Sequence, residues 1–599
     1  MERTHESGKL RLEHAGQDVA LAGWVARRRD LGGVVFIDLR DRSGVVQLVF
    51  RPDISQEALY GADRLRSEYV IAVKGAVVAR DADSVNPKVE TGEIEVLVRE
   101  LTVLNTAKTP PFAMEDSGPV DEAVRLRYRY LDLRRPQMQK TLQLRHRVMK
   151  SVRDFLDGHG FLEIETPYLT KSTPEGARDY LVPSRLRPGE FYALPQSPQL
   201  FKQLLMVAGY ERYFQLVRCF RDEDLRADRQ PEFTQLDMEV SFADKEYILN
   251  LMEQMVAELF ANVLCVSLER PFLRLTYREA MERFGSDKPD LRFGLELRDV
   301  SSVVAGSEFK VFGDALARKG RVKALVVPGC GSYSRKEIEE LGKLAARYRA
   351  KGLAWMAVEE GGAVRSPIAK FFTPEQLSGI VAQSMARPGD LILFVADHAR
   401  VVADALGALR THLGRTLGLV EEGVYRFLWV TEFPQFEYDE EASRYVAMHH
   451  PFTMPMEEDL PLLESRPGDV RAQAYDLVLN GYEIGGGSTR IHQRATQERM
   501  FAALGFSDQE AADKFGFFLD AFDYGAPPHG GIALGMDRLV MLMAGQESLR
   551  EVIAFPKTAS ATDLMVEAPA EISREQWDTL RLQLMPPKKP MPSAVMERV

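Results

Sequence analysis

Hydrophobic and polar residues alternate along much of the first 105 residues, a period typical of β-strands with one buried face. One stretch with helical spacing, residues 55–66, lies between the third and fourth alternating runs. Five strands with a helix after the third is the order of an OB-fold β-barrel, whose strand surface binds single-stranded nucleic acid. We therefore predict an N-terminal OB-fold β-barrel over residues 1–105. Its strands are expected at residues 17–28, 32–41, 44–50, 69–80 and 92–105.

The pattern changes after residue 105. Several prolines and the lack of a sustained period predict a hinge over residues 106–138. Apolar residues at helical spacing predict a helix over residues 136–159. A strand-like run follows at residues 161–169, where Pro167 favours an edge or an interface over a central position in a sheet.

Alternating strand and helix signals with no recognisable chemistry mark residues 287–420 as an inserted α+β domain. The segments on either side, 139–286 and 421–568, then form one interrupted domain. Residues 569–599 are expected to be a partly flexible C-terminal extension, because they include a proline-rich and lysine-rich tract. The chain is thus predicted to be a multidomain α+β protein.

Composition excludes several classes of protein. Hydrophobic residues make up 45% of the chain and charged residues 28%, as in an ordinary globular protein. The three cysteines are widely spaced and fit neither a disulfide framework nor a zinc site. The chain does not begin like a signal peptide, and no run approaches the roughly 18 apolar residues that a membrane helix needs. We expect a protein of the reducing cytoplasm that has no membrane contact.

The charge is unevenly distributed. The chain carries a net charge of −11, but residues 121–153 contain ten basic and three acidic residues, a local net charge of +7. An acidic protein with one basic stripe can bind a polyanion there and repel it elsewhere. The alternative is a solvated helix face, which is common for charge runs of this size.

The stretch 218–240 carries the strongest candidate chemistry. Its loop combines Arg221, Arg226 and Arg229 with Phe233, and guanidinium forks suit phosphate groups while an aromatic face suits a base. A salt-bridged surface hairpin is the alternative. The pattern Phe-Arg-x-Glu at residues 220–223, followed by Pro-Glu-Phe-Thr-Gln at 231–235, resembles motif 2 of the class II aminoacyl-tRNA synthetases.

Two further segments resemble the same family. The helix, Gly160 and the strand that ends at Pro167 resemble motif 1, through which these enzymes form homodimers. The glycines of residues 525–535 lead into a helix that bears Arg538 and resembles motif 3, where the backbone approaches ATP. The resemblance implies a catalytic domain built on an antiparallel sheet. The insert at 287–420 resembles that of bacterial aspartate-specific members.

Residues suited to a small zwitterion lie between the first two motifs. Glu175 lies in a loop flanked by glycine and proline, and Gln199 and Lys202 share one face at a helix start. Arg490 offers a fork for a carboxylate. By the resemblance, Glu175 closes over the amino acid and Lys202 meets its side-chain carboxylate. The implied aspartate-binding residues are Glu175, Gln199, Lys202, Arg221, Asp237, His449 and Arg490.

A nucleotide and a metal complete the expected site. Asp476 and Glu483 on a predicted strand pair can hold magnesium, and the adjacent His449 and His450 are expected to point to opposite faces. By the resemblance, Arg221, Glu223 and Arg538 are the catalytic residues. The implied ATP-binding residues are Arg221, Asp222, Glu223, Gln230, Phe233, Glu483, Gly535, Met536, Asp537 and Arg538.

Residues 23–50 resemble the anticodon-binding domain of bacterial aspartyl-tRNA synthetases. By that resemblance, Phe36 stacks on an anticodon base and Gln47 reads a base edge, with Arg28 and Leu31 beside them. Without it, a phenylalanine in an alternating run is more often a core residue. Relatives that charge both tRNA-Asp and tRNA-Asn often have histidine after the Arg-Arg-Arg-Asp run, so Leu31 predicts a preference for tRNA-Asp.

The resemblance implies a cytoplasmic, homodimeric, magnesium-dependent enzyme that attaches L-aspartate to tRNA-Asp through an aspartyl-adenylate, consuming ATP and releasing AMP and pyrophosphate. An asparaginyl or lysyl ligase is one alternative, against which Lys202 and Arg490 argue. A tRNA-binding paralogue without catalysis is another, but it would be expected to lose Arg221, Glu223 or Arg538, and all three are present.

Overall fold

The chain folds into two compact units. The first combines Met1–Gln143 with Ile553–Ala570, and the second combines Leu144–Val552 with Glu571–Val599. The computed structural model describes every residue except 1, 116–117, 174–175, 441–442 and 586–599. Glu175 and the end of the predicted C-terminal extension therefore lie outside the described residues.

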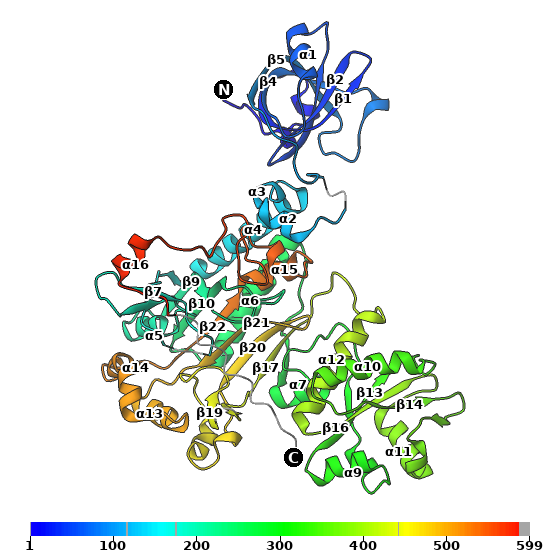
Figure 1. Ribbon diagram of the computed structural model, residues 1–599, viewed down its shortest axis with the longest axis vertical. Coiled ribbons are helices and arrows are strands. Elements are labelled where there is room, and N and C mark those ends of the chain that lie inside the picture. The colour runs from blue at the N-terminus through cyan, green and yellow to red at the C-terminus, as the bar shows by residue number, and fades with distance from the viewer. Residues whose placement is uncertain (1, 116–117, 174–175, 441–442, 586–599) are drawn as a thin grey trace. The chain divides into compact units, whose positions relative to one another are not determined.

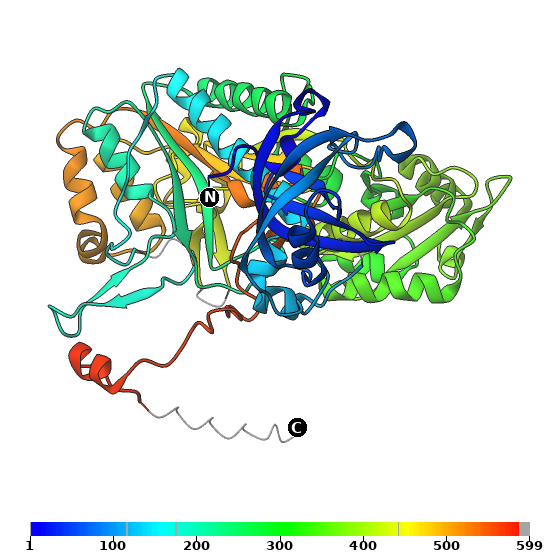
Figure 2. The same ribbon diagram turned by 90° about the horizontal axis from the view of Figure 1, so that it is seen from above.

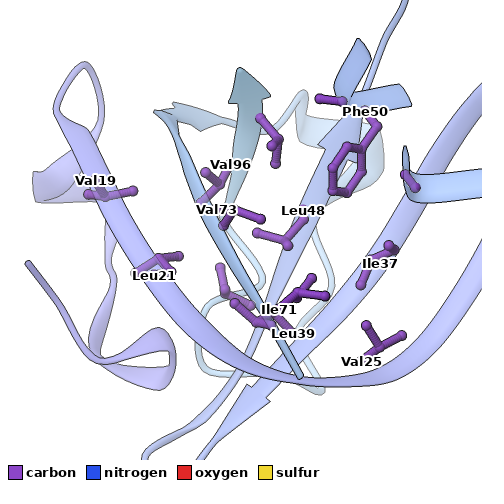
Figure 3. Packing of buried hydrophobic residues seen from close by; sticks show 14 of the residues in the cluster. Val19, Leu21, Val25, Ile37, Leu39, Leu48, Phe50, Ile71, Val73 and Val96 are labelled. Atoms are coloured by element: carbon purple, nitrogen blue, oxygen red, sulfur yellow. The ribbon is translucent and has the colours of Figure 1, made fainter. Parts of the chain in front are cut away.

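The first unit contains a five-stranded barrel with strands β1 (Asp18–Leu31), β2 (Val34–Asp41), β3 (Gly44–Phe50), β4 (Val70–Ala79) and β5 (Ile94–Asn105). The barrel closes in the order β1–β2–β3–β5–β4, and helix α1 (Gln56–Asp63) follows the third strand. Alternate apolar residues such as Val25, Ile37 and Leu48 point inward and are fully buried (Figure 3). The predicted OB-fold barrel is confirmed.

Two short helices, α2 (Glu122–Arg127) and α3 (Arg129–Asp132), lie in the predicted hinge. The carboxylate of Asp132 is fully buried, and three guanidinium groups surround it. Its oxygens lie 2.9 Å from Nε of Arg125, 2.5 Å from Nη1 of Arg129 and 3.4 Å from Nη1 of Arg135. One buried anion thus holds three turns of the hinge together.

The basic window of residues 121–153 presents less positive surface than its net charge indicates. Seven of its ten basic residues pair with carboxylates, three of them with Asp132. Arg129 also donates to the backbone carbonyls of Ile553 and Ala554, which joins the hinge to the returning C-terminal segment. Much of this positive charge is therefore compensated by carboxylates of the protein, which weakens the predicted basic stripe.

The second unit is built on an eight-stranded sheet, in the spatial order β11 (Leu273–Thr276), β17 (Phe427–Thr431), β20 (Ala474–Leu479), β21 (Tyr482–Thr489), β22 (His529–Gly535), β10 (Glu232–Ser241), β9 (Arg212–Phe220) and β6 (Leu162–Glu163) (Figure 1). The six central strands are antiparallel, and the two edge strands run parallel to their neighbours. The sheet brings three segments that are distant in sequence side by side.

Helices cover this sheet, and α6 (Lys245–Leu264), drawn in green, runs along one face, against β22 (Figure 2). The helix predicted at 136–159 is confirmed, but the strand predicted at 161–169 has only two residues in a sheet. The helices are α4 (Pro136–Gly158), α5 (Gln199–Val207), α6 (Lys245–Leu264), α13 (Arg494–Ala503), α14 (Asp508–Phe522), α15 (Met536–Met543) and α16 (Arg574–Leu580). Two small hairpins pair β7 (Leu181–Pro183) with β8 (Phe191–Ala193) and β18 (Phe436–Asp439) with β19 (Arg444–Ala447).

The predicted insert has its own antiparallel sheet, in the order β12 (Leu297–Asp299), β13 (Arg321–Val327), β16 (Leu391–Asp397), β14 (Ala354–Val358) and β15 (Val364–Arg365). Separate apolar clusters cover its two faces. Helix α7 (Tyr277–Phe284) precedes the insert. The helices of the insert are α8 (Ser301–Val304), α9 (Lys310–Ala317), α10 (Arg335–Arg347), α11 (Pro374–Ser384) and α12 (Ala399–Thr416). Across the described residues, no helix combines the length and apolar character needed to cross a membrane.

Candidate active site

A cavity of about 790 Å³ opens on the eight-stranded sheet. Strand β21 lines it with three consecutive glycines, and a Cβ atom on Gly486 would come within 2.6 Å of Oδ1 of Asp476. Only glycine permits this close approach. Most of the predicted catalytic-domain residues meet here: Gln199, Lys202, Arg221, Asp222, Glu223, Gln230, Phe233, Asp237, His449, Asp476, Glu483, Arg490, Gly535, Asp537 and Arg538.

Four buried charged side chains meet at the amino-acid end of the predicted site. Nζ of Lys202 lies 2.9 Å from Oδ1 of Asp237 and 3.2 Å from Oε2 of Glu239. Nε of Arg490 donates to Oε1 of Glu239 at 2.9 Å, and Nη2 donates to Oε2 at 3.2 Å. The fork of Arg490, which the sequence assigned to a substrate carboxylate, is thus held largely by a carboxylate of the protein itself.

The two carboxylates of this cluster respond differently to burial. Burial opposes the ionisation of Glu239, but Arg490 and Lys202 lower its pKa to about 2. Burial raises the pKa of Asp237, and the nearby charge of Lys202 does not offset it. Glu239 is therefore the fixed counter-ion of the two cations, and the charge state of Asp237 is sensitive to what binds beside it.

The adjacent histidines both line the cavity, which corrects the expectation that they point apart. The chain leaves strand β19 at Ala447, so strand alternation does not apply to them. Burial disfavours charged His449, but its hydrogen bond to Asp476, at 3.4 Å, raises its pKa above the usual value. Burial and the charge of Arg490 hold the pKa of His450 far below the usual value, so its Nε2 accepts from Nη1 of Arg490 at 2.6 Å.

Residues of the β9–β10 connection form the side of the cavity assigned to the nucleotide. The guanidinium of Arg221 lies 5.0 Å from the ring centre of Phe233, a cation–π contact that fixes both groups. Nε of Arg221 is buried and has no hydrogen-bond partner within the described chain. Glu223 pairs with Arg229 at 3.1 Å. The loop thus presents arginine and aromatic groups side by side, as the sequence predicted.

Two residues assigned to ATP have different surroundings. Met536 is fully buried and does not line the cavity, so its side chain is not in position to contact a nucleotide. Asp537 does line it, but its carboxylate accepts from Nη1 of Arg145 at 2.5 Å and from the backbone N–H of Thr234 at 2.6 Å. These bonds fasten α15 to α4 and β10, which is a structural role.

Asp476 and Glu483 form a carboxylate pair suited to a cation. The position of a Cβ atom on Gly486 lies 2.6 Å from Oδ1 of Asp476 and 3.9 Å from Oε1 of Glu483, so both groups flank one point. Burial and the charge of Glu483 raise the pKa of Asp476 to about 6. Ionised Asp476 is thus unfavourable in the empty site, and a bound cation would stabilise it. Magnesium commonly takes one or two carboxylates and completes its shell with water and phosphate, so this donor set fits it.

Arg538 closes the same region. Its Nη1 donates to the backbone carbonyl of Glu483, and its Nη2 lies 3.2 Å from Oδ2 of Asp228. A guanidinium at the start of a helix therefore lies against the backbone of Glu483, one of the two carboxylate residues. This arrangement of opposite charges suits a polyphosphate accompanied by a metal ion.

A model described as class II tRNA synthetases (D, K and N) matches residues 121–559. The chain belongs to the class II aminoacyl-tRNA synthetases. A second model, described as an OB-fold nucleic acid binding domain, matches residues 19–104 of the synthetase. These matches cover the barrel and both halves of the domain that contains the cavity.

Curated relatives match the synthetase along nearly its whole length. It is 61% identical to the aspartate–tRNA(Asp/Asn) ligase of Geobacillus sp. (strain WCH70), over 98% of this chain and 99% of the relative. It is 60% identical to the aspartate–tRNA ligase of Geobacillus kaustophilus, over 98% of this chain and 100% of the relative. The first name specifies tRNA-Asp and tRNA-Asn, and the second does not specify a tRNA.

Among solved structures, the synthetase resembles the asparaginyl-tRNA synthetase of Pyrococcus horikoshii complexed with asparaginyl-adenylate, with a TM-score of 0.59. The alignment covers 93% of this chain and 98% of that chain, at 20% identity. At this identity the likeness concerns the fold.

A second group of predicted residues lies on the barrel of the synthetase. Phe36 points outward between buried Val35 and Ile37, so the alternative that it belongs to the barrel core is excluded. Gln47 faces Asp38 across β2 and β3, and Nη2 of Arg29 donates to Oδ1 of Asp38 at 2.7 Å and to Oε1 of Gln47 at 3.1 Å. Phe36 and Gln47 therefore share an outer face.

Arg28 is not on that face, which corrects its assignment. It donates to the backbone carbonyl of Ala62 at 3.1 Å and to Oδ1 of Asp63 at 2.7 Å, at the end of α1. Arg29 takes the expected place beside Phe36. Leu31, two residues further along β1, is 66% exposed.

Sequence reasoning assigned no role to Asp38 and Glu95 on the barrel of the synthetase, to His450 at the cavity, or to the buried Glu239 beside it. A signal for Glu239 was present, because polar residues at 235, 237 and 239 alternate with the apolar residues at 236, 238 and 240. That alternation indicates a polar face on a buried strand. On the barrel, Nε2 of Gln47 donates to Oε2 of Glu95 at 2.9 Å.

Proposed function

We propose that this synthetase attaches L-aspartate to tRNA-Asp in two ATP-dependent steps. The observation that carries the choice of amino acid is the number of N–H donors left open in the buried charge cluster. It supports one carboxylate as the side chain of the substrate, and it separates aspartate from asparagine and lysine.

The donors can be counted group by group. Arg490 has five N–H groups, of which two donate to Glu239 and two from Nη1 face Ser488 and His450. Lys202 has three, and two face Asp237 and Glu239. Among the described residues, none takes up the last N–H of either group, so one N–H remains on each cation. A carboxylate accepts both, whereas a carboxamide would turn its own N–H groups toward one of them, and a lysine ammonium would be repelled.

Activation of aspartate is an in-line displacement. An oxygen of its α-carboxylate attacks the α-phosphorus of ATP, the bond to the bridging oxygen breaks, and pyrophosphate leaves. Arg221 faces the α-phosphate and Arg538 the γ-phosphate, where they stabilise charge in the transition state. Asp476 and Glu483 would hold magnesium, which supplies further positive charge to the phosphates when bound.

In the second step, the terminal ribose hydroxyl of the tRNA attacks the carbonyl carbon of the aspartyl-adenylate. The aspartyl group passes to the ribose, and AMP leaves. No side chain of the protein forms a covalent intermediate, so both steps depend on positioning and on charge stabilisation.

The proposal extends to a cytoplasmic homodimer joined at the β6 edge of the sheet. Leu162, on this edge strand, is 51% exposed, and Leu169, which follows it in the chain, is 54% exposed. Exposed apolar side chains at a sheet edge favour burial against a partner, here a second copy of the chain. Sedimentation equilibrium tests this, and a monomer at micromolar concentration would contradict it.

Amino-acid-dependent exchange of pyrophosphate into ATP tests the function directly. Aspartate should support exchange, and asparagine and lysine should not. Exchange that is supported by asparagine alone would overturn the donor count, and the absence of exchange with every amino acid would favour a tRNA-binding paralogue.

Replacing Phe36 by alanine should weaken aspartylation of tRNA and leave pyrophosphate exchange unchanged. The ring lies on the outer face of the barrel, so the expected cost is the loss of base stacking, about 1–3 kcal/mol. Steady-state kinetics of both reactions measure the separation. Tyr60→Ala, which removes another exposed aromatic ring of the barrel, is the control and should change neither rate. Equal loss in both reactions of Phe36→Ala would show that the ring supports folding.

The tRNA preference should depend on Leu31. An exposed leucine offers no hydrogen bond to a base edge. The polar edge of an incorrect anticodon base would lose its bound water there without gaining a partner, which should weaken binding of that tRNA by about 1–3 kcal/mol. We expect the native chain to favour purified tRNA-Asp over tRNA-Asn, and Leu31→His to reduce that preference. Leu12→His, at another exposed leucine, should not. Equal aspartylation of the two tRNAs by the native chain would contradict this assignment.

A further inference from the structure

Three buried polar side chains form a row that leads to the amino-acid pocket. His529 begins strand β22, and Gln203 and Gln199 lie one turn apart on helix α5. All three are buried, and of the three only Gln199 lines the cavity. The row connects the start of the motif 3 strand to a residue beside the proposed aspartate site.

The direction of every hydrogen bond in this row follows from one backbone carbonyl. Nδ1 of His529 lies 2.7 Å from the oxygen of Pro527, which can only accept, so Nδ1 carries the proton. Burial lowers the pKa of His529; of the nearby charges, Glu239 opposes the shift, and Arg490 and His492 add to it. The ring is therefore neutral, and its Nε2 accepts.

The same logic orients the two amides. Nε2 of His529 lies 3.1 Å from the side chain of Gln203, which must present its NH₂ group there. Its oxygen then faces the other way and accepts from Nε2 of Gln199 at 3.0 Å. With its NH₂ group engaged in this bond, the amide of Gln199 has its oxygen left to face the cavity. No described residue donates to that oxygen.

We infer that His529 and Gln203 are positioning residues that fix the amide of Gln199 with its oxygen toward the amino-acid pocket, where it accepts from the α-ammonium group of the substrate. The inference rests on the proposed function and adds a device for selectivity. A freely rotating Gln199 would present its NH₂ group part of the time and repel the ammonium. The row removes that orientation before substrate arrives.

The test is the Michaelis constant for aspartate in pyrophosphate exchange. Gln203→Met keeps the length of the side chain but cannot accept from Gln199, so KM for aspartate should rise about five- to tenfold, the effect of one hydrogen bond. KM for ATP should not change. Gln203→Glu retains the acceptor, and its carboxylate favours a proton on Nε2 of His529, which is neutral in the native chain, so KM for aspartate should stay within about twofold of the native value.

A double-mutant cycle separates positioning from general damage. Gln199→Ala should raise KM for aspartate by itself, and Gln203→Met should add nothing in that background. Equal increases from Gln203→Met with and without Gln199 would overturn the inference, as would an increase with Gln203→Glu as large as with Gln203→Met. Failure of the proposed function is distinguishable, because the native chain would then show no exchange with aspartate.

Discussion

Arg490→Leu should raise KM for aspartate at least about a hundredfold and leave KM for ATP nearly unchanged. The variant removes the N–H that we assign to the substrate carboxylate, and it also removes the bidentate partner of Glu239. Glu239 then remains buried with Lys202 as its remaining close cation, so the free energy of unfolding should fall by about 3–5 kcal/mol. Both quantities are measurable, by exchange kinetics and by denaturant titration.

A second variant distinguishes the two effects. In Arg490→Leu combined with Glu239→Leu, both buried charges are replaced by apolar groups, which should recover much of the lost stability. The KM for aspartate should not recover, because the donor is still missing. If the folded single variant retained its native KM for aspartate, the assignment of Arg490 to the substrate would be wrong.

Asp132→Asn should destabilise the unit that contains the hinge by about 3–5 kcal/mol, because three guanidinium groups would lose a shared buried anion. The neutral amide keeps the size of the side chain, so the effect reports charge and not volume. Denaturant unfolding followed by a probe on the barrel measures it. The site that we assign to pyrophosphate exchange lies in the other unit. The KM values for aspartate and ATP should therefore stay close to those of the native chain, even though the free energy of unfolding falls.

Asp154→Asn is the matched control. Asp154 pairs with Lys150 on the exposed face of α4, where an isolated ion pair contributes less than about 1 kcal/mol. If the two variants lost equal free energy of unfolding, the buried ion pairs of Asp132 would stabilise the fold no more than an exposed ion pair does.

Periodicity predicted the barrel and the long helix α4 because each buries a single face, and a repeated pattern in the sequence records that burial. The assignment of Arg28 to the anticodon face came from the resemblance, and strict alternation from inward-facing Val25 would agree with it by placing Arg28 outward. A β-bulge between Val25 and Arg27 shifts the register, so that Arg27 and Arg29 face outward instead. A bulge leaves the composition of a strand unchanged, and periodicity alone does not locate it.

The candidate site was predicted in large part because its residues lie in three motifs, each local in the sequence. What could not be predicted is the pairing between motifs. Glu239 and Arg490 are 251 residues apart, and their contact depends on β10, β21 and β22 lying side by side. The burial of Asp132 could not be predicted either. The basic residues around it in the sequence indicated a charged surface, but three of them pair with its buried carboxylate.

The balance of charge in the amino-acid pocket also bears on which small anions can compete with the substrate. Lys202 and Arg490 lie against Asp237 and Glu239, so while Asp237 is ionised these four groups carry no net charge that would concentrate phosphate or sulfate from the surrounding solution. An inorganic anion would meet two N–H donors but also the nearby carboxylate of Asp237, which it cannot neutralise. Aspartate brings its own ammonium group for that carboxylate. The pocket can therefore contain two cations and still remain available at the phosphate concentrations of a cell.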